Sequence, residues 1–286
     1  MLTDCHTHLQ PHGQAPPMTV ERIEAYVEAG RARGVERIAI TEHLFRFEEA
    51  YKALHGWWDD DPDAHLAGLA RAYWEDHVSG SVADYVRTVE AAKRKGLPVL
   101  LGLEMDWIHG REDALAAFLK PYDWDIVIGS VHYIGSWGFD CDEFMAEWAR
   151  RDVADVWSDY GALVRELAES GLADVLAHPD LPKVFGHRPA DETPLHSAIL
   201  AGAAVNGTAI ELNSNGLRKK CGEIYPALAL VERAHAAGLP VTLASDAHTP
   251  DRVGANFDDL IAWARRAGYR EASAFVGRAR TEYAIG

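Results

Sequence analysis

Short apolar runs alternate with longer segments of helical periodicity along the whole chain, and this alternation predicts strands and helices in turn. The predicted strands cover Leu2–Cys5, Arg37–Thr41, Pro98–Leu103, Asp125–Val131, Ala173–Ala177, Thr208–Leu212 and Pro240–Ser245. Because nearly every position in these runs is apolar, they are typical of parallel strands that are buried on both faces. Seven such units with no break in composition favour one α/β domain over residues 1–286, folded as a closed or nearly closed βα barrel.

Residues that commonly cap helices mark the predicted helical segments. The segments run from the residue after Thr19 to about Arg33, from Ser81 to Lys95, over Asp152–Ser170 and over Cys221–Ala237. Thr19 and Ser81 are residue types that accept hydrogen bonds from the first turn of a helix. A glycine follows each segment, where it allows the chain to leave the helix: Gly34, Gly96, Gly171 and Gly238.

One long segment, Leu44–Gly80, interrupts the alternation between the second and third predicted strands. It is rich in tryptophan, histidine and aspartate. Because it directly follows a strand end, one interpretation is an insertion on the rim of the barrel that acts as a lid or a wall for substrate. The other interpretation is a helical excursion that packs against the barrel and carries its histidines on the surface.

Side chains of the types that bind metals follow each of the seven strands. They are His6 and His8, Glu42 and His43, Glu104, His132, His178 and Asp180, Glu211 and Asn213, and Asp246 and His248. The carboxyl ends of the strands in a parallel barrel meet at one rim, so these side chains are expected to converge there. A doubly wound open sheet, the alternative architecture, would gather ligands from only two or three strand ends. The distribution therefore favours the barrel and a polynuclear metal site.

The composition narrows the classes of partner. The formal charge of −16 argues against a nucleic acid or an anionic membrane as the general partner. Three cysteines are too few and too scattered for a disulfide framework, and Cys5 is expected to pack in the core. No secretory signal or apolar run long enough to cross a bilayer is visible, so we expect a soluble cytoplasmic protein. The sequence predicts no particular oligomeric state.

The spacing of the ligand-type residues suits a hydrolytic metal centre. His6 and His8 are two positions apart on a strand, so both can face one ion. Glu104 follows an apolar strand, where a carboxylate has no packing role, and is the natural bridge between two ions. Asp246 and His248 repeat the spacing of the first pair. His132 and His178 stand at equivalent strand ends, and His12 and His43 can supply a further ion.

Other sites are poorly supported. The sequence has no G-x-S-x-G elbow, no Walker A sequence and no H-E-x-x-H or C-x-x-C pattern. The remaining histidines do not follow a strand, and we expect them to be structural or on the surface: His55, His65, His77, His109, His187, His196 and His235. His109 and His187 are the exceptions, since either could instead contact and orient a metal ligand.

Taken in order along the chain, these motifs resemble the PHP (polymerase and histidinol phosphatase) family, over nearly the whole length. The general pattern consists of His6-Thr7-His8, Thr41-Glu42-His43, Glu104, His132, His178 and Ser245-Asp246-Ala247-His248. Strings typical of the stand-alone histidinol-phosphate phosphatases are Pro11-His12-Gly13, Gly102-Leu103-Glu104-Met105-Asp106, Gly129-Ser130-Val131-His132-Tyr133, Trp137-Gly138-Phe139-Asp140, His178-Pro179-Asp180-Leu181 and the run from Glu211 to Lys219. Glu42 stands where an aspartate is common, and the insertion at 44–80 is longer than expected of the family.

The resemblance implies a distorted (β/α)7 TIM-like barrel that holds three divalent metal ions, zinc, manganese or iron. The implied ligands are His6, His8, Glu104 and Asp246 for the first ion, Glu104, His132 and His178 for the second, and His12, His43 and His248 for the third. The implied reaction is hydrolysis of a phosphate monoester, L-histidinol phosphate to L-histidinol and phosphate in histidine biosynthesis, by a water activated at the metal centre.

Several roles around that centre are expected from the chemistry. Lys183 and Arg218 are candidates for binding the substrate phosphate, with ordinary surface cations as the alternative for each. Asp246 or His248 would pass the proton to the leaving group, and the sequence does not choose between them. Asp106 or Asp180 would meet the ammonium group of the substrate.

Three other functions stay open. A related phosphoesterase would act on a nucleotide or sugar phosphate at the same site. A metal-dependent amidohydrolase shares the H-x-H motif but usually has a lysine at a mid-chain strand end, which is missing here. A non-catalytic metal-binding module would be expected to have lost part of the ligand set.

Overall fold

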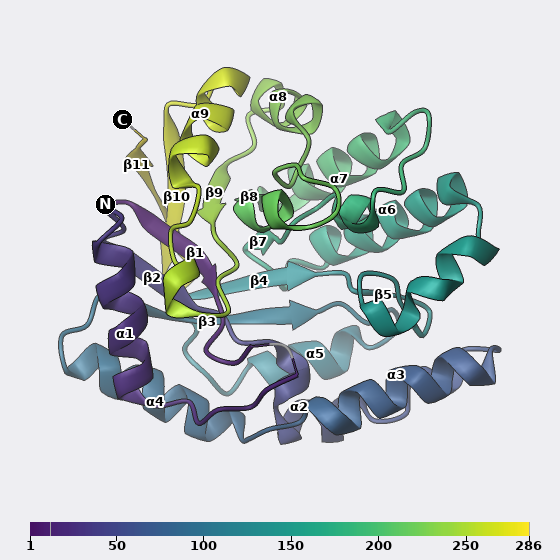
Figure 1. The fold of residues 1–286 in the computed structure, drawn as a ribbon, viewed down its shortest axis with the longest axis horizontal. Helices are drawn as coiled ribbons and strands as arrows, with labels where there is room; N and C mark the ends of the chain where they lie inside the picture. The colour runs from purple at the N-terminus through teal and green to yellow at the C-terminus, as the bar shows by residue number, and fades with distance from the viewer. Residues whose placement is uncertain (12, 286) are drawn as a thin grey trace.

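A computed structural model of the chain shows one sheet curved into a barrel, with helices around its outside (Figure 1). The structure describes residues 1–11 and 13–285. Within them the barrel strands run parallel in the order β1 (Thr3–Thr7), β2 (Arg37–Ile40), β3 (Val99–Asp106), β4 (Ile126–Ser130), β7 (Val175–Leu176), β8 (Ala209–Asn213) and β9 (Val241–Ala244). A single bridge between Thr7 and Ala247 joins β1 to the end of β9, so the barrel is nearly closed. The predicted α/β barrel is confirmed.

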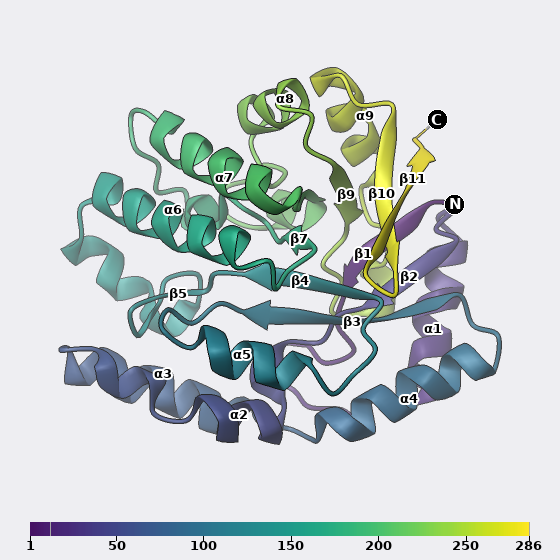
Figure 2. The same cartoon turned by 180° about the vertical axis from the view of Figure 1, so that it is seen from behind.

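Helices cover the outside of the barrel, and both views show them surrounding the sheet (Figures 1 and 2). They are α1 (Val20–Arg31), α2 (Glu48–Leu54), α3 (Ala64–His77), α4 (Val82–Arg94), α5 (Glu112–Leu119), α6 (Val153–Ser170), α7 (Thr193–Asn206), α8 (Leu228–Ala236) and α9 (Phe257–Ala267). The expected N-caps are confirmed, because the side chains of Thr19 and Ser81 each accept a backbone hydrogen bond from the first turn, and Asp152 caps α6 in the same way. No helix in the described residues is both long and apolar enough to cross a bilayer.

Shorter elements connect these units. The 3₁₀ helices are η1 (Leu44–Arg46), η2 (Trp57–Asp60), η3 (Asp142–Arg150), η4 (Leu181–Phe185), η5 (Ser214–Arg218) and η6 (Pro250–Arg252). Two small antiparallel hairpins are formed by β5 (Tyr133–Ile134) with β6 (Trp137–Gly138) and by β10 (Glu271–Val276) with β11 (Ala279–Ala284).

Several predicted boundaries differ from the observed ones, among them the end of β1 and both ends of β7, and two further differences change the surroundings of the strand ends. The helix expected over Cys221–Ala237 begins only at Leu228, because Tyr225 instead exchanges two backbone hydrogen bonds with Asn213 at the end of β8. Strand β3 continues past Leu103 to Asp106, so Glu104 lies inside the strand. Its backbone N–H bonds to the carbonyl of Glu42, and the next two residues pair with β4.

The segment between β2 and β3 folds into η1, α2, η2 and α3, which lie together along one side of the barrel (Figure 1). Its tryptophans Trp57, Trp58 and Trp74 are buried against one another. A hydrogen bond of 2.7 Å from the backbone N–H of Ser136 to Asp61 ties the segment to the β5–β6 hairpin. The segment therefore has its own apolar core, continuous with that of the barrel.

Small and medium side chains fill the interior of the barrel. Cys5 is fully buried there, as expected, in a cluster whose other members are Ala39, Leu100, Ile126, Ile128, Val175, Ala177, Ala209 and Phe275. Phe275 comes from β10, and the turn of its hairpin binds the start of two middle strands. Arg278 bonds to Asp174, and Gly277 and Arg278 bond to Asp125. The hairpin, which the sequence reading did not anticipate, thus crosses the amino-terminal end of the barrel.

Candidate active site

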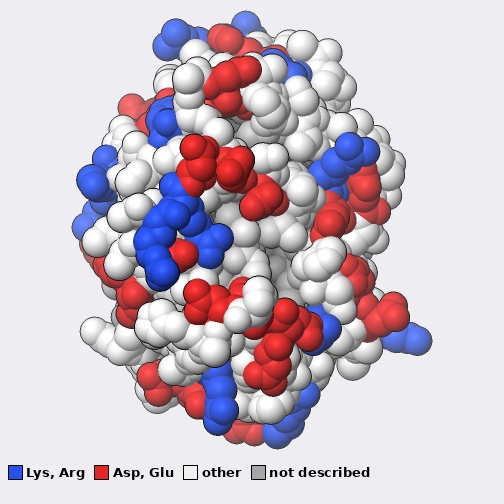
Figure 3. Space-filling model, turned by 90° about the vertical axis from the view of Figure 1, so that its right-hand side faces the viewer, with Lys and Arg blue, Asp and Glu red and all other residues white. Residues whose placement is uncertain are grey.

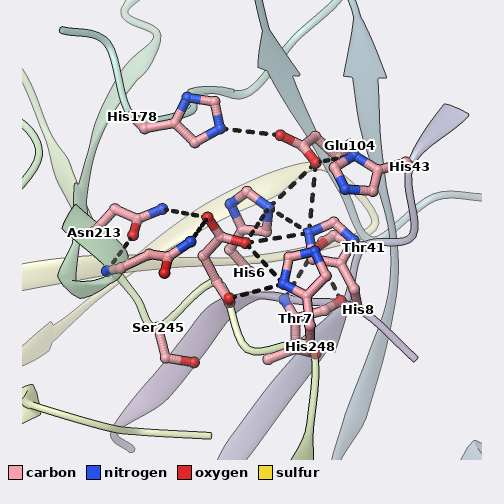
Figure 4. Close-up of polar contacts among 12 residues, drawn as sticks. His6, Thr7, His8, Thr41, His43, Glu104, His178, Asn213, Ser245 and His248 are labelled. Carbon is pink, nitrogen blue, oxygen red and sulfur yellow. Dashed lines mark hydrogen bonds and ion pairs between the residues drawn. The ribbon is translucent and has the colours of Figure 1, made fainter. Parts of the chain in front are cut away.

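The carboxylate of Glu104 lies at the centre of a cluster of histidines at the carboxyl ends of the strands (Figure 4). Its Oε2 atom is 2.6 Å from Nδ1 of His43 and 3.4 Å from Nε2 of both His6 and His8. Its Oε1 atom is 3.1 Å from Nε2 of His178 and 3.5 Å from Nε2 of His132. One buried carboxylate on β3 thereby connects ring nitrogens from five different histidines.

A second carboxylate, that of Asp246, closes the cluster on the side of β9. Its Oδ1 atom lies 3.8 Å from Nε2 of His6, 3.5 Å from Nε2 of His8 and 3.5 Å from Nδ1 of His248. Its Oδ2 atom accepts hydrogen bonds from the side-chain amides of Asn213 and Asn215, at 3.4 and 2.9 Å. These amides fix the plane of the carboxylate, so Oδ1 is left for the histidines.

The donor set fits metal ions better than it fits hydrogen bonding alone. Nε2 of His6 and Nε2 of His8 face each other at 2.8 Å, and two carboxylate oxygens lie within 3.8 Å of them. Oε2 of Glu104 is buried and makes no hydrogen bond of acceptable geometry within the described residues. Histidine nitrogens and carboxylate oxygens in this arrangement are the ligands of borderline metals such as zinc, manganese and iron.

Within this cluster, three groups of ligand atoms are close enough to share an ion. They are His6, His8 and Asp246; His43, Glu104 and His132; and His8, His43 and His248. His43 therefore stands between two groups, whereas the family resemblance implied that it serves the third ion alone. His12, expected beside it, lies outside the described residues.

Carboxylates outside the cluster orient its histidines. Oε1 of Glu211 is 2.8 Å from Nδ1 of His6, and Oδ1 of Asp106 is 2.7 Å from Nδ1 of His132. In each case the bonded Nδ1 carries the proton, which leaves Nε2 free to bind a metal. Glu42 lies 3.5 Å from Nδ1 of His8 and also accepts the backbone N–H groups that follow. The sequence reading did not assign these roles, although Glu211 and Glu42 do stand at strand ends.

The electrostatics keep the central carboxylates ionised. Burial alone would raise the pKa of Glu104, but His43, His6 and His132 hold it well below its usual range. The pKa of Asp246 is likewise held well below its usual range, because His6, His8 and His248 outweigh the effect of burial. The pKa values of His6 and His8 are raised in turn, against the effect of burial, by the carboxylates around them, so carboxylates and histidines balance each other's charge in the buried cluster.

Two residues of the cluster have left-handed backbone conformations that side chains rarely adopt. The φ angles are 27° at His178 and 51° at Asp246. The backbone N–H of His178 donates a hydrogen bond of 2.7 Å to Oε2 of Glu211, which helps to hold this conformation. Non-glycine residues in this region typically cost about 1–3 kcal/mol, and such strain concentrates at functional sites.

A cavity of about 590 Å³ opens above the cluster. Its floor includes Glu104, His132, His178, Asp246 and His248. The insertion contributes Phe45, Tyr73 and His77 to one wall, so this segment packs against the barrel and also borders the cavity. His77 was expected to be structural, and no signal in the sequence distinguishes it. Figure 3 shows a hollow in this face, with basic side chains gathered on one side and acidic ones along other edges.

The two cations considered for phosphate binding have different surroundings. Arg218, at the end of η5, borders the cavity, and one of its two terminal nitrogens bonds to the carbonyl of Ser245 at 2.9 Å. The other is buried without a hydrogen-bond partner among the described residues. Lys183 is fully buried and absent from the cavity wall, because its ammonium group binds Asp180, Glu223 and the carbonyl of Ile224 at 2.8–2.9 Å. The geometry does not support phosphate binding by Lys183.

The acidic residues expected to meet the substrate ammonium are also engaged elsewhere. Asp106 is buried beneath His132, to which it is hydrogen bonded. Asp180 is buried against Lys183 and accepts the backbone N–H of Ala227 at 2.8 Å. Neither residue borders the cavity, so a different group must fill that role.

Comparison with known proteins shows similarity over nearly the full chain. The profile of the PHP domain family matches residues 4–215. A probable histidinol-phosphatase of Deinococcus radiodurans is 36% identical over 274 residues, which cover 94% of this chain and 95% of that protein. The histidinol-phosphatase of Bacillus subtilis is 25% identical and covers 90% of this chain and 96% of its own.

A solved structure shares the fold. The histidinol phosphate phosphatase of Lactococcus lactis, determined in complex with zinc, L-histidinol and phosphate, superimposes with a TM-score of 0.74. The alignment covers 98% of both chains at 19% sequence identity, so the likeness concerns the architecture.

Proposed function

The chain belongs to the PHP domain family, and from this premise we propose that it is a metal-dependent phosphatase that hydrolyses L-histidinol phosphate to L-histidinol and phosphate. The observation that carries the proposal is the cluster around Glu104, in which five histidines and two ionised carboxylates open into a cavity large enough for a small substrate. The Deinococcus radiodurans relative, which is similar over nearly the whole chain, is described as a probable histidinol-phosphatase, and this supports the choice of substrate.

We further propose that three divalent ions occupy the cluster. Their ligands would be His6, His8, His12, His43, Glu104, His132, His178, Asp246 and His248, with zinc, manganese or iron as the metal. The zinc found in the Lactococcus lactis protein supports this choice of metals. When bound, such ions lower the pKa of water and offset the charge that develops on a phosphoryl group.

The chain's own residues perform the remaining tasks. Arg218 would bind a phosphate oxygen, because the residue borders the cavity, one of its terminal nitrogens has no hydrogen-bond partner among the described residues, and guanidinium groups bind phosphate well. His248 would pass the proton to the leaving alkoxide, since the low pKa of Asp246 makes that carboxylate a poor proton donor. Glu211 and Asp106 would hold the rings of His6 and His132 in the orientation that leaves Nε2 available for a metal.

We propose that residues 1–286 act as one domain, with residues 44–80 as part of the substrate wall. Phe45, Tyr73 and His77 support this reading because they border the cavity while the tryptophans beneath them anchor the segment. The segment would thus be a fixed wall of the site.

The test is an assay of metal-loaded protein against a panel of phosphate esters. We expect kcat/KM for L-histidinol phosphate to exceed that for nucleotide and sugar phosphates by at least about 100-fold, since an enzyme discriminates by contacts made to the whole substrate. Equal activity on all esters would reject the assignment of substrate but retain the phosphatase. Preference for a nucleotide or sugar phosphate would instead support the related phosphoesterase activity.

A further inference from the structure

Above the metal cluster, the charged residues that border the cavity are divided between two walls. Arg218, Lys219 and Lys220 form the basic wall, where η5 ends. Asp140, Asp142 and Glu143 form the acidic wall, in the segment that follows the β5–β6 hairpin. A substrate that carries a phosphate and a separate positive charge matches this division.

Asp140 is the acidic residue nearest in sequence to the hairpin. Among the described residues, its side chain accepts one hydrogen bond, a weak one of 3.9 Å from the thiol of Cys141. His77 lies on the neighbouring wall but does not neutralise the acidic group, because burial lowers its pKa. The residue borders the cavity and makes no ion pair with a lysine or arginine among the described residues, although it lies close enough to His132 to raise the pKa of that ring against the effect of burial.

Tyr133 provides a second, independent sign of a ligand. This residue is 4% exposed and borders the same cavity. Its hydroxyl group is buried without a hydrogen-bond partner among the described residues. Tyr133 pairs with Gly138 across the β5–β6 hairpin, two residues before Asp140, so one small hairpin presents both polar groups. A buried hydroxyl left unpaired is costly unless a ligand completes it.

Aromatic rings form an apolar surface beside this hairpin. Tyr73 and His77 are stacked with their centroids 3.9 Å apart, and Phe45 meets both of them edge to face. Phe45 also stacks on His43 of the metal cluster at 4.6 Å. A continuous aromatic surface therefore runs from the reacting end of the cavity toward its acidic wall, as a planar heterocyclic substrate requires.

We propose that Asp140, assisted by the hydroxyl of Tyr133, binds the ammonium group of the substrate and determines the specificity of the site. The ammonium donates hydrogen bonds to the Asp140 carboxylate and to the Tyr133 oxygen, while the phosphate is held at the metal cluster and Arg218. This assignment rests on the proposed function, and it fills the role that the buried Asp106 and Asp180 do not take.

The experiment compares two substrates that differ only in the ammonium group: L-histidinol phosphate and its deamino analogue, 3-(imidazol-4-yl)propyl phosphate. In the Asp140→Asn variant, we expect the ratio of the two kcat/KM values to fall by about 10- to 100-fold, mainly through KM for the cationic substrate, because a charge-assisted hydrogen bond is lost. Inhibition by L-histidinol should weaken in parallel. The exposed Asp159→Asn on α6 is the matched control and should keep the wild-type ratio.

The outcomes separate this assignment from the proposed function. Wild-type protein that prefers L-histidinol phosphate, together with an Asp140→Asn variant that keeps the wild-type ratio, overturns the role of Asp140 alone. Wild-type protein that fails to hydrolyse L-histidinol phosphate overturns the proposed function. If Asp140→Asn does not fold, Tyr133→Phe takes its place and should lower the same ratio by about 3- to 10-fold for one lost hydrogen bond. An unchanged ratio in that variant rejects the subsite.

Discussion

Glu211 holds His6 by a hydrogen bond of 2.8 Å between Oε1 and Nδ1, and the opposite ring nitrogen of His6 faces Glu104. The other oxygen of Glu211 accepts the backbone N–H of His178 and the side-chain amide of Asn213. One carboxylate on β8 therefore sets the position of two histidines of the cluster. Because both of its oxygens accept hydrogen bonds, no neutral side chain of the same size can replace it.

Glu211→Gln should weaken metal binding. A glutamine has one acceptor oxygen, and its NH2 group would face one of the donors that Glu211 now binds. The ring of His6 would then be poorly oriented. We expect metal affinity to fall by about 10- to 100-fold, the usual effect of losing such an outer partner. Calorimetric titration of metal-free protein measures this change, with the exposed Glu232→Gln as the control. Equal affinity in both variants would show that Glu211 has only a packing role.

Removing the metals should destabilise the protein as well as inactivate it. Ions that bind only the folded state at 100 times their Kd add about 2.7 kcal/mol for each independent site. We therefore expect Tm to fall on treatment with a chelator and to recover on addition of zinc or manganese. In the Glu104→Gln variant, chelation should lower Tm much less, because the central carboxylate that would bind the ions is lost. If chelation lowers Tm of this variant as much as that of the wild type, the stabilising ions bind outside this cluster.

Arg218→Gln should impair binding of the phosphate. Loss of a hydrogen bond from a charged group raises KM and the inhibition constant of inorganic phosphate by about 10- to 100-fold. Arg218→Lys keeps the charge and should recover part of this loss. Arg87, an exposed residue on α4, provides the control Arg87→Gln. If phosphate inhibits all variants equally, Arg218 does not contact the substrate.

Lys183→Met should unfold more easily without a specific effect on KM. The substitution removes the cation that compensates Asp180, which is fully buried. Removing one partner of a buried ion pair lowers the free energy of unfolding by about 3–5 kcal/mol. Urea denaturation measures the loss, and the exposed Lys120→Met should stay within about 0.5 kcal/mol of the wild type. If the variant is as stable as the wild type but has a raised KM, Lys183 contacts the substrate.

Two glycine substitutions should have opposite effects on stability. A methyl group at Gly129 in β4 would lie 2.7 Å from Leu167 and 2.8 Å from Ala173, so Gly129→Ala should cost about 1–3 kcal/mol. Gly68 lies exposed within α3 with open space around it. Gly68→Ala should stabilise the fold by about 0.5–1 kcal/mol, because alanine favours the helix. Thermal unfolding compares both with the wild type, and a loss in both variants would contradict the packing argument.

The sequence predicted the barrel and the grouping of the ligand-type residues, because apolar strands and the residues that follow them are local patterns. His6, Glu104 and Asp246 are far apart in sequence, yet their positions after strands were enough to bring them together. The same reasoning failed for Lys183, since nothing local shows that Asp180 and Glu223 surround it. Whether a cation faces a substrate or another part of the chain depends on contacts between distant segments.

The helix boundary near Tyr225 was missed for a related reason. Capping signals place the end of the helix correctly, but its start depends on the pairing of Tyr225 with Asn213 at the end of β8. The hairpin at 271–284 is a local pair of β10 with β11, but the sequence does not show that its turn binds Asp125 and Asp174 in the middle of the chain. The alternating pattern of residues 271–284 does not identify these distant contacts.

The position of that hairpin also bears on how the chain folds during synthesis. Phe275 completes the interior of the barrel, and Arg278 joins the starts of β4 and β7. Since these residues follow all the barrel strands in the sequence, the amino-terminal end of the barrel stays uncovered until residues 275–278 have left the ribosome. Nascent chains that stop before residue 275 expose the apolar interior to water and to chaperones.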